Sequence, residues 1–391
     1  MCRESAPRVA RLRHPDVAST ATGFNLTDEQ LELRHTVRSF LAGKADEAQV
    51  RRQMESPQGY DPAVWGQLSD QLGLTGLAIP EKFGGQGFTF VELGIVVEEM
   101  GRALLPAPYF ASIVLAANVL LHCGDDAAQK RYLPGIASGA TLATLAVTEA
   151  SGRWESGAID LQAHDAGGEW VLNGAKSYVL DGCSAGVLLV VARTGAGISL
   201  FAVDEFDRVT RRPLSTLDQT RKQARIEFNN APATLVGRDG EAWPLLMRVF
   251  ALGSAALAAE QIGGAQRCLE MAVDYAKARR QFGKPIGSFQ AIRHKCADVF
   301  LDIECARGAA YYAVGAAAEL AEELPAAASL AKAHSSDAYV HAATANVQIH
   351  GGIGFTWEHP AHLYFKRARS SGHLLGDATF HRGLLADRIG L

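Results

Sequence analysis

The hydrophobic residues of this chain change their spacing twice, and these two changes constrain the fold more than any other feature of the sequence. From residue 26 to about residue 142, apolar residues recur three and four positions apart, which is the period of an amphipathic helix. Between about residues 143 and 238 the chain breaks into short β-branched-rich runs bounded by Gly, Asn and Asp, which is typical of strands. Helical spacing then returns and continues to the C-terminus. The sequence therefore predicts helices, then a small β unit, then helices again.

From this order we predict an α+β protein with three domains. Residues 26–142 form an N-terminal α domain, residues 143–238 a central antiparallel β domain, and residues 239–391 a C-terminal α domain resembling a four-helix bundle. The C-terminal part is rich in alanine, and small residues let helices approach closely. Residues 1–25 contain arginines but lack the apolar run of a secretory signal, so we expect a flexible tail.

The bulk composition excludes several classes of function. The formal net charge is −4, which provides no concentrated positive field for nucleic acid or an anionic membrane. The 6 cysteines are scattered without a CxxC pair, so neither a zinc site nor a disulfide framework is indicated. No apolar run reaches the roughly 20 residues needed to span a bilayer. We therefore expect a cytoplasmic protein with no nucleic-acid partner and no membrane span.

Within the first helical region, Thr27 precedes Asp28, Glu29 and Gln30, which is the pattern of a capped helix start with acidic residues in its first turn. Further helical patterns cover residues 62–72, 90–103 and 110–121. A glycine-rich loop, residues 83–87, lies between the first and second of them. These local signals agree with the predicted α domain.

The most specific candidate site is the run RRQFGKPI at residues 279–286, at the end of a long predicted helix. An arginine followed by a glutamine suits a phosphate and the edge of a heterocycle, because guanidinium supplies charge and a planar set of donors. A charged helix terminus is the ordinary alternative.

Two further segments indicate a ligand site only when they are considered together with residues 279–286. Residues 348–355, QIHGGIGF, contain glycines after a helix, which leave backbone N–H groups free to approach a ligand but also serve as a simple C-cap. Thr148 and Glu149 end the first β run, where a threonine is also a common strand residue.

In this order and with these separations, the three segments resemble the acyl-CoA dehydrogenase family. The resemblance covers the chain from residue 26 to the end. Other stretches agree with it: residues 80–85 (PEKFGG), 173–176 (NGAK), 217–221 (LDQTR) and 355–359 (FTWEH).

The resemblance implies an FAD-dependent enzyme that introduces an α,β double bond into an acyl-CoA thioester. In this family a carboxylate takes the α-proton while the β-hydride passes to flavin N5, so the cofactor carries the redox step. It also implies a dimer or tetramer of like or unlike chains, with electron-transfer flavoprotein or a similar protein as electron acceptor. The residues carried over are Thr148 and Tyr178 beside the flavin ring, Arg279, Gln281 and Phe282 on the neighbouring subunit's FAD, and Gln348, Gly351 and Gly352 along the pyrophosphate.

The chain departs from the family at the catalytic base. Alignment on residues 366–368 (KRA) puts Leu375 at the usual glutamate position, and alignment on Phe282 and Gly283 puts Gly253 at the less common one. Neither residue can accept a proton. Asp377 is the nearest carboxylate in sequence, and it is therefore our candidate base, with a helix cap or surface ion pair as the alternative.

Two further departures lie in the β domain. Where the family has TEPxAGSD this chain has TEASGRWE, so Trp154 replaces a serine that usually approaches the ligand. In the stretch that lies against the flavin, Leu180 replaces a residue with a hydroxyl donor.

Alternatives to a complete enzyme follow from these departures. One is a non-catalytic partner subunit, which keeps the fold while another chain provides the base. Another is a metal protein, because Glu358, His359 and His362 lie close together, but we find no second Glu-x-x-His set and Pro360 interrupts the stretch. A Rossmann nucleotide site is disfavoured because no GxGxxG follows a strand. The acyl group is not determined by the sequence.

Overall fold

The computed structural model describes residues 26–391, so the predicted tail at residues 1–25 lies outside the described part. The first region is helical, as expected, and Thr27 forms the predicted capping box with Gln30. Residues 110–116 form a π-helix rather than the α-helix that the apolar pattern suggested, and α5 continues from it. The α-helices of this region are α1 (Asp28–Lys44), α2 (Glu47–Glu55), α3 (Pro62–Asp70), α4 (Phe90–Ala103), α5 (Ala117–His122) and α6 (Asp126–Ala137).

The central domain contains one seven-stranded sheet. Its strands are β1 (Ala143–Ala146), β2 (Gln162–Asp165), β3 (Trp170–Leu180), β4 (Val187–Arg193), β5 (Ile198–Val203), β6 (Val209–Pro213) and β7 (Gln223–Val236). Strand β4 pairs with both β2 and β5, and β5 also pairs with β7, so the sheet closes on itself through β3. Phe201, Leu172 and Ile226 are among the fully buried residues of its interior.

The prediction of an antiparallel domain was wrong for two pairings. β1 runs parallel to β4 over four residues, and β2 meets β4 in a single parallel pair. A parallel pair requires a long connection between its strands, and here the β2–β3 hairpin lies between β1 and β4 in the chain. β2 and β6 were also missed, because QAHD and VTRRP carry polar side chains with no clear alternation.

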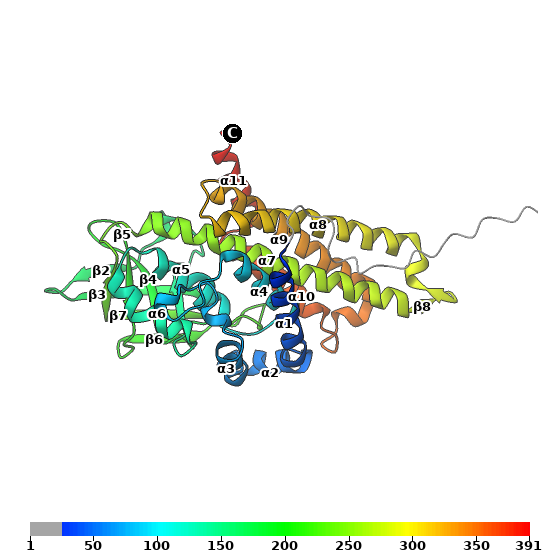
Figure 1. The fold of residues 1–391 in the computed structure, drawn as a ribbon, viewed down its shortest axis with the longest axis horizontal. Coiled ribbons are helices and arrows are strands. Elements are labelled where there is room, and N and C mark those ends of the chain that lie inside the picture. The colour runs from blue at the N-terminus through cyan, green and yellow to red at the C-terminus, as the bar shows by residue number, and fades with distance from the viewer. Residues whose placement is uncertain (1–25) are drawn as a thin grey trace, which may run out of the picture.

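The C-terminal domain is again helical. Its helices are α7 (Ala242–Ala278), α8 (Gln290–Ala318), α9 (Leu324–His350), α10 (Ala361–His373) and α11 (Ala378–Arg388). A small hairpin of β8 (Arg280–Gln281) and β9 (Lys284–Pro285) follows α7. Figure 1 shows α7, α8 and α9 side by side along the longest axis, with the sheet at one end of α7 and β8 at the other. The predicted α+β class, with helical domains on both sides of a β domain, is confirmed.

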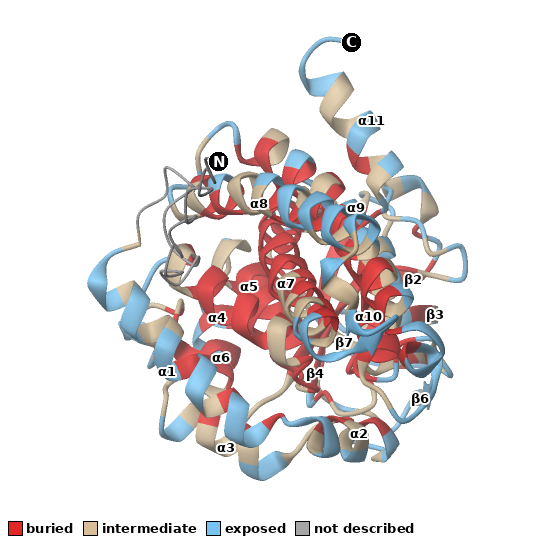
Figure 2. Cartoon of the chain, turned by 90° about the vertical axis from the view of Figure 1, so that its right-hand side faces the viewer, coloured by how far each residue is buried: buried red, intermediate tan, exposed pale blue. Residues whose placement is uncertain are grey.

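Helix α4 of the N-terminal domain joins this bundle by packing against α7. A Cβ at Gly101 of α4 would lie 2.1 Å from the carbonyl oxygen of Glu260, and a Cβ at Gly263 of α7 would lie 1.9 Å from that of Glu98. Glycine is therefore required at both positions for the two backbones to touch. Figure 2 shows the resulting core, with buried residues concentrated on α4, α5 and α7.

Helix α7 is, within residues 26–391, the one helix long and apolar enough to cross a membrane by length and composition. Its most apolar stretch is 72% buried inside the fold. Such burial is what the central helix of a packed domain shows, so length and composition are weak evidence for a membrane span here.

Candidate active site

The two positions at which the sequence places a catalytic base face each other in the structure. Leu375 lies in the turn between α10 and α11 and is 2% exposed. A Cβ built on Gly253, in the first half of α7, would lie 2.9 Å from Leu375 Cδ1 and 2.9 Å from Leu115 Cδ2. Both base positions therefore share one apolar space, closed by the π-helix that carries Leu115. An ionised carboxylate in this space would be strongly desolvated.

Asp377 does not point into this space. It is exposed, it is the N-cap residue of α11, and its Oδ1 accepts a hydrogen bond of 2.8 Å from the backbone N–H of Phe380. Aspartate is among the preferred N-cap residues because its carboxylate satisfies a free N–H at the positive end of the helix. The geometry therefore favours the capping alternative for this residue.

The turn that holds Leu375 is fixed by two buried side chains. Lys332 of α9 is fully buried and its Nζ donates hydrogen bonds to the carbonyl oxygens of Gly372 and Gly376, both at 3.1 Å. Burial lowers the pKa of Lys332 to about 7. His381 Nε2 lies 3.0 Å from the carbonyl oxygen of Leu375. Burial lowers the pKa of His381 to about 4, so the ring is neutral at pH 7 and Nε2 donates to that carbonyl.

Trp154 lies beside this turn. Its ring packs edge-on against Phe250 of α7, with ring centroids 5.3 Å apart. Both residues line a small cavity of about 30 Å³, together with Leu375 and with Phe380 and His381 of α11. This cavity holds about one water molecule. Access for a larger group on this side of Leu375 therefore requires Trp154 or α11 to move.

On the β domain, Thr148 and Tyr178 lie near each other in different environments. Thr148 is buried and its hydroxyl donates to the carbonyl oxygen of Ser177 at 2.7 Å. Tyr178 is 46% exposed and has a φ of +60°, a conformation that few non-glycine residues adopt. Backbone strain of this kind is concentrated at ligand sites.

The neighbouring Glu149 forms an ion pair with Lys176. Glu149 Oε1 is 2.6 Å from Lys176 Nζ, and Lys176 is fully buried. Glu149 also accepts hydrogen bonds from the backbone N–H groups of Asp160 and Leu161. Desolvation lowers the pKa of Lys176 to about 8 despite this partner. The pair fixes the start of the TEASGRWE segment to β3.

A buried group of charges lies between the β domain and the C-terminal helices, and sequence reasoning missed it. Arg367 of α10 contacts Asp218 Oδ2 at 2.8 Å and Glu260 Oε1 at 3.0 Å, and Arg221 contacts the other oxygen of Glu260. All four residues are at most 9% exposed. The segments LDQTR and KRA were identified as family-like, but nothing in their spacing shows that they meet.

Asp181 lies within the field of this group. It is buried, and desolvation raises its pKa to about 6, although the nearby Arg221 and Arg367 oppose the shift. A carboxyl group with a pKa in this range exchanges protons near neutral pH.

The remaining predicted ligand residues lie at the opposite end of α7 (Figure 1). Phe282 sits at the tip of the β8–β9 hairpin, is 90% exposed and has a φ of +50°. Arg279 and Gln281 are exposed beside it. Gln348, at the end of α9, accepts a hydrogen bond of 2.7 Å from Lys295 Nζ.

Gly351 and Gly352 follow α9 at this same end of the fold. Both are exposed, and a Cβ on either would meet no heavy atom within 4 Å. Their backbones are therefore open to a ligand or to another chain. The structure thus brings the predicted residues together in two sets, one at each end of α7, and not in one pocket.

Comparison with known proteins identifies the family to which the chain belongs. The sequence pattern of the acyl-CoA dehydrogenase N-terminal domain matches residues 27–140, and that of the acyl-CoA dehydrogenase C-terminal domain matches residues 240–390. The chain is 37% identical over 350 residues to the acyl-CoA dehydrogenase IpdE2 of Mycobacterium tuberculosis, covering 89% of this chain and 93% of that protein.

Solved structures show the same fold over nearly the whole chain. A single-substitution variant of the Tcur3481-Tcur3483 steroid ACAD has a TM-score of 0.84 and 30% identity, with coverage of 92% of this chain and 97% of that one. The ChsE4-ChsE5 complex from Mycobacterium tuberculosis has a TM-score of 0.85 and 28% sequence identity, with coverage of 93% of this chain and 98% of that one. The chain therefore belongs to the acyl-CoA dehydrogenase family, and it is an FAD-dependent enzyme that acts on acyl-CoA thioesters.

Proposed function

We propose that the chain works in an assembly in which each FAD is shared between two subunits. The observation that carries this proposal is the separation of the two residue sets along α7. Helical rise puts about 39 Å between Gly253, beside the Thr148 end, and Arg279. One FAD molecule held by both sets therefore needs the Thr148 and Tyr178 end of one chain and the Arg279 end of another. A dimer or tetramer of like or unlike chains meets this requirement.

The residues at the Arg279 end fit the phosphate and adenine part of FAD. Arg279 offers a guanidinium to phosphate, Gly351 and Gly352 offer open backbone, and Phe282 offers an aromatic face that is 90% exposed in the single chain. Thr148 and Tyr178 are suited to the ring end. When bound, FAD supplies the acceptor for the β-hydride, and the protein's part is to orient the thioester and hold a base.

Loss of flavin from an Arg279→Ala variant tests the shared site. Charge-assisted hydrogen bonds contribute about 1.5–3 kcal/mol each, so FAD affinity is expected to fall by a factor of about 10 to 150. Arg212→Ala, an exposed arginine on β6, is the matched control and is expected to keep its flavin. The 450-nm absorbance after gel filtration measures both, and equal flavin retention would remove Arg279 from the site. Flavin release upon dilution to monomer tests the subunit sharing.

For the proton acceptor we propose Asp377 as the first candidate to test, because it follows Leu375 by only two residues. Its carboxylate caps α11, so it would have to leave Phe380 in order to act. Asp377→Asn separates the two roles, because asparagine caps a helix about as well as aspartate but cannot accept the proton. A base role predicts a loss of 100-fold or more in flavin reduction with normal thermal stability. Unchanged turnover would assign Asp377 to capping.

A second candidate is that another chain supplies the carboxylate, because neither Leu375 nor Gly253 carries one. This is the partner-subunit arrangement, and the relatives ChsE4-ChsE5 and Tcur3481-Tcur3483 carry the names of two chains each. Leu375→Glu tests it, since a carboxylate at this position restores the usual base. Flavin reduction by the variant, with none by the wild-type chain alone, would support the second candidate. Turnover by the wild-type chain alone would refute it.

For the acyl group we propose a bulky, ring-containing thioester, on the basis of the structural relative named as a steroid ACAD. Trp154 and Phe250 would offer aromatic surface to such a ring once the path beside Leu375 opens. Flavin bleaching against steroid-derived, glutaryl, isobutyryl and butyryl thioesters tests this choice. Preference for a short linear thioester would overturn it.

We further propose electron-transfer flavoprotein, or a similar flavoprotein, as electron acceptor, and the cytoplasm as location. The cysteines in the described residues, Cys123, Cys183, Cys268, Cys296 and Cys305, are all free, which fits a reducing compartment. Reoxidation of the reduced enzyme by purified electron-transfer flavoprotein, measured by stopped flow, tests the acceptor.

A further inference from the structure

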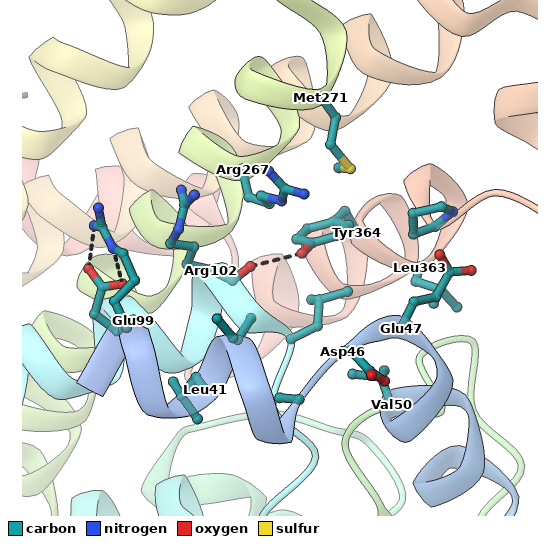
Figure 3. A pocket seen from close by; sticks show the side chains of 16 residues that line it. Leu41, Asp46, Glu47, Val50, Glu99, Arg102, Arg267, Met271, Leu363 and Tyr364 are labelled. Carbon is teal, nitrogen blue, oxygen red and sulfur yellow. Dashed lines mark hydrogen bonds and ion pairs between the residues drawn. The ribbon is translucent and has the colours of Figure 1, made fainter. Parts of the chain in front are cut away.

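A cavity separate from the space around Leu375 and Gly253 lies between the two helical domains. Its volume is about 530 Å³, within the range of small-molecule sites. Helices α1, α2 and α4 of the N-terminal domain form it together with α7 and α10 of the C-terminal domain. Figure 3 shows Arg102, Arg267 and Tyr364 on one side of this pocket and Asp46 and Glu47 on the other.

The floor between these two sides is apolar. Leu41, Val50, Leu104 and Leu363 line the pocket, and each is at most 3% exposed by residue. Met271 lies above them in the view of Figure 3. A ligand that lies across the pocket would therefore place an apolar body on this floor.

The arginine side carries one unmatched positive charge. Arg102 forms a two-pronged ion pair with Glu270, at 2.6 Å for each contact, and Arg267 reaches the same carboxylate at 3.4 Å. Within residues 26–391, Glu270 is the one carboxylate within ion-pair distance of either arginine. Two guanidinium groups thus share one carboxylate, and Arg267, whose side chain is 39% exposed, is the less engaged of the two. Arg267 also hydrogen-bonds to the Tyr364 side chain, and its remaining donors suit an anion.

The opposite side repels a second anion. Asp46 caps α2 through the backbone N–H of Gln49, and Glu47 pairs with Arg51 at 2.7 Å. Two carboxylates thus lie on this side, and among the described residues Arg51 is the one cation paired with them. The pocket therefore has a positive end, where Arg267 can bind an anion, and an acidic end at Asp46 and Glu47. The apolar floor lies between the two ends.

From this polarity we propose that the pocket binds a monocarboxylate with an apolar body, at a site separate from the one that processes the acyl-CoA thioester. The carboxylate pairs with Arg267, and the apolar body covers Leu41, Leu104 and Leu363. Because the walls come from both helical domains, bound ligand links α1 and α2 to α7 and α10.

Decanoate is the probe for this site, with decanol and decanedioate as comparison compounds. Isothermal titration into the flavin-loaded protein is expected to give saturable one-to-one binding of decanoate. Decanol lacks the charge that Arg267 recognises, and the second carboxylate of decanedioate would meet Asp46 and Glu47. Both are expected to bind about tenfold or more weakly than decanoate.

Two variants locate the binding. Arg267→Gln removes the positive charge that pairs with the carboxylate. Ala42→Trp places a large ring at the rim of the pocket, and because Ala42 is exposed on α1, this change leaves the core unchanged. Each is expected to weaken decanoate binding about tenfold or more. Ala48→Trp, on an exposed position of α2 that does not line the pocket, is the matched control and is expected to bind as wild type.

The proposal is overturned if decanoate shows no saturable binding at concentrations up to about 1 mM. A dissociation constant above this value would be too weak for a specific site. It is also overturned if Arg267→Gln and Ala42→Trp bind decanoate like wild type, since binding then occurs elsewhere, or if decanedioate binds as well as decanoate. Melting temperature and flavin content show that each variant is folded. If Arg267→Gln alone is unstable, Ala42→Trp decides.

Discussion

The contact between Gly253 and Leu375 can be measured with a double-mutant cycle. A Cβ at Gly253 would approach Leu375 Cδ1 and Leu115 Cδ2 to 2.9 Å, closer than side-chain atoms pack. Gly253→Ala gains about 1 kcal/mol of helix propensity and loses about 1–3 kcal/mol to overpacking. Leu375→Ala removes a side chain that is 2% exposed and is expected to cost about 2–5 kcal/mol of unfolding free energy.

In the double variant the new methyl group enters space that Leu375 has left. The overpacking against Leu375 disappears, and part of the cavity is filled, at about 0.8 kcal/mol for each methylene-sized group buried. The double variant is therefore expected to be about 1–2 kcal/mol more stable than the sum of the single changes predicts. Urea unfolding monitored by circular dichroism at 222 nm gives the four free energies.

Leu246 provides the control for this cycle. It is fully buried on α7, and helical rise puts it about 10 Å from Gly253, so Gly253→Ala with Leu246→Ala is expected to be additive. Additivity of Gly253→Ala with Leu375→Ala, within about 0.5 kcal/mol, would refute the conclusion that the two base positions share one space.

Two further predictions concern the buried charges around the site. Glu260→Gln removes the carboxylate that Arg221 and Arg367 share and leaves Arg367 paired with Asp218, so it is expected to cost about 3–5 kcal/mol in urea unfolding. Glu47→Gln, which breaks a surface pair, is expected to cost under about 1 kcal/mol, and equal costs would contradict the buried cluster. Burial lowers the pKa of Lys332 from 10.5 to about 7. Above pH 7 the unfolded chain therefore binds more protons than the folded chain, and the free energy of unfolding rises with pH. Lys332 contributes at most about 1.4 kcal/mol per pH unit to this rise. Lys332→Met is expected to reduce the slope of unfolding free energy between pH 7 and about pH 8.5, and an unchanged slope would show that Lys332 keeps its charge when buried.

The sequence predicted the architecture because the relevant signals are local. The helix-to-strand change in apolar spacing, the capping box at Thr27 and the limits of α4 depend on neighbouring residues, and the structure agrees with each of them. The parallel pairing of β1 with β4 depends on a connection of about 40 residues, and no local pattern reports it.

The site was predictable only in part, for the same reason. The motifs located Arg279, Phe282, Gly351 and Leu375 along the chain, but could not show that the predicted ligand residues separate into two sets at the ends of α7. The contact of Arg367 with Asp218 joins residues 149 positions apart, which pattern reasoning on one chain does not reach. The π-helix was missed because its apolar spacing over seven residues resembles that of an α-helix.

Leu375 stands where the sequence predicts the family's base, and the turn around it is held in one conformation. Lys332 holds the carbonyl groups of Gly372 and Gly376, while His381 holds that of Leu375 itself. Leu375 has a φ of +63°, an unfavourable conformation for leucine that this set of contacts maintains. None of these contacts uses the Leu375 side chain, so Leu375→Glu changes the group in the apolar space without removing what positions it. The variant therefore reports on the chemistry of the position, and a failure to reduce flavin in a folded, flavin-loaded Leu375→Glu protein would count against position 375 as the site of the base.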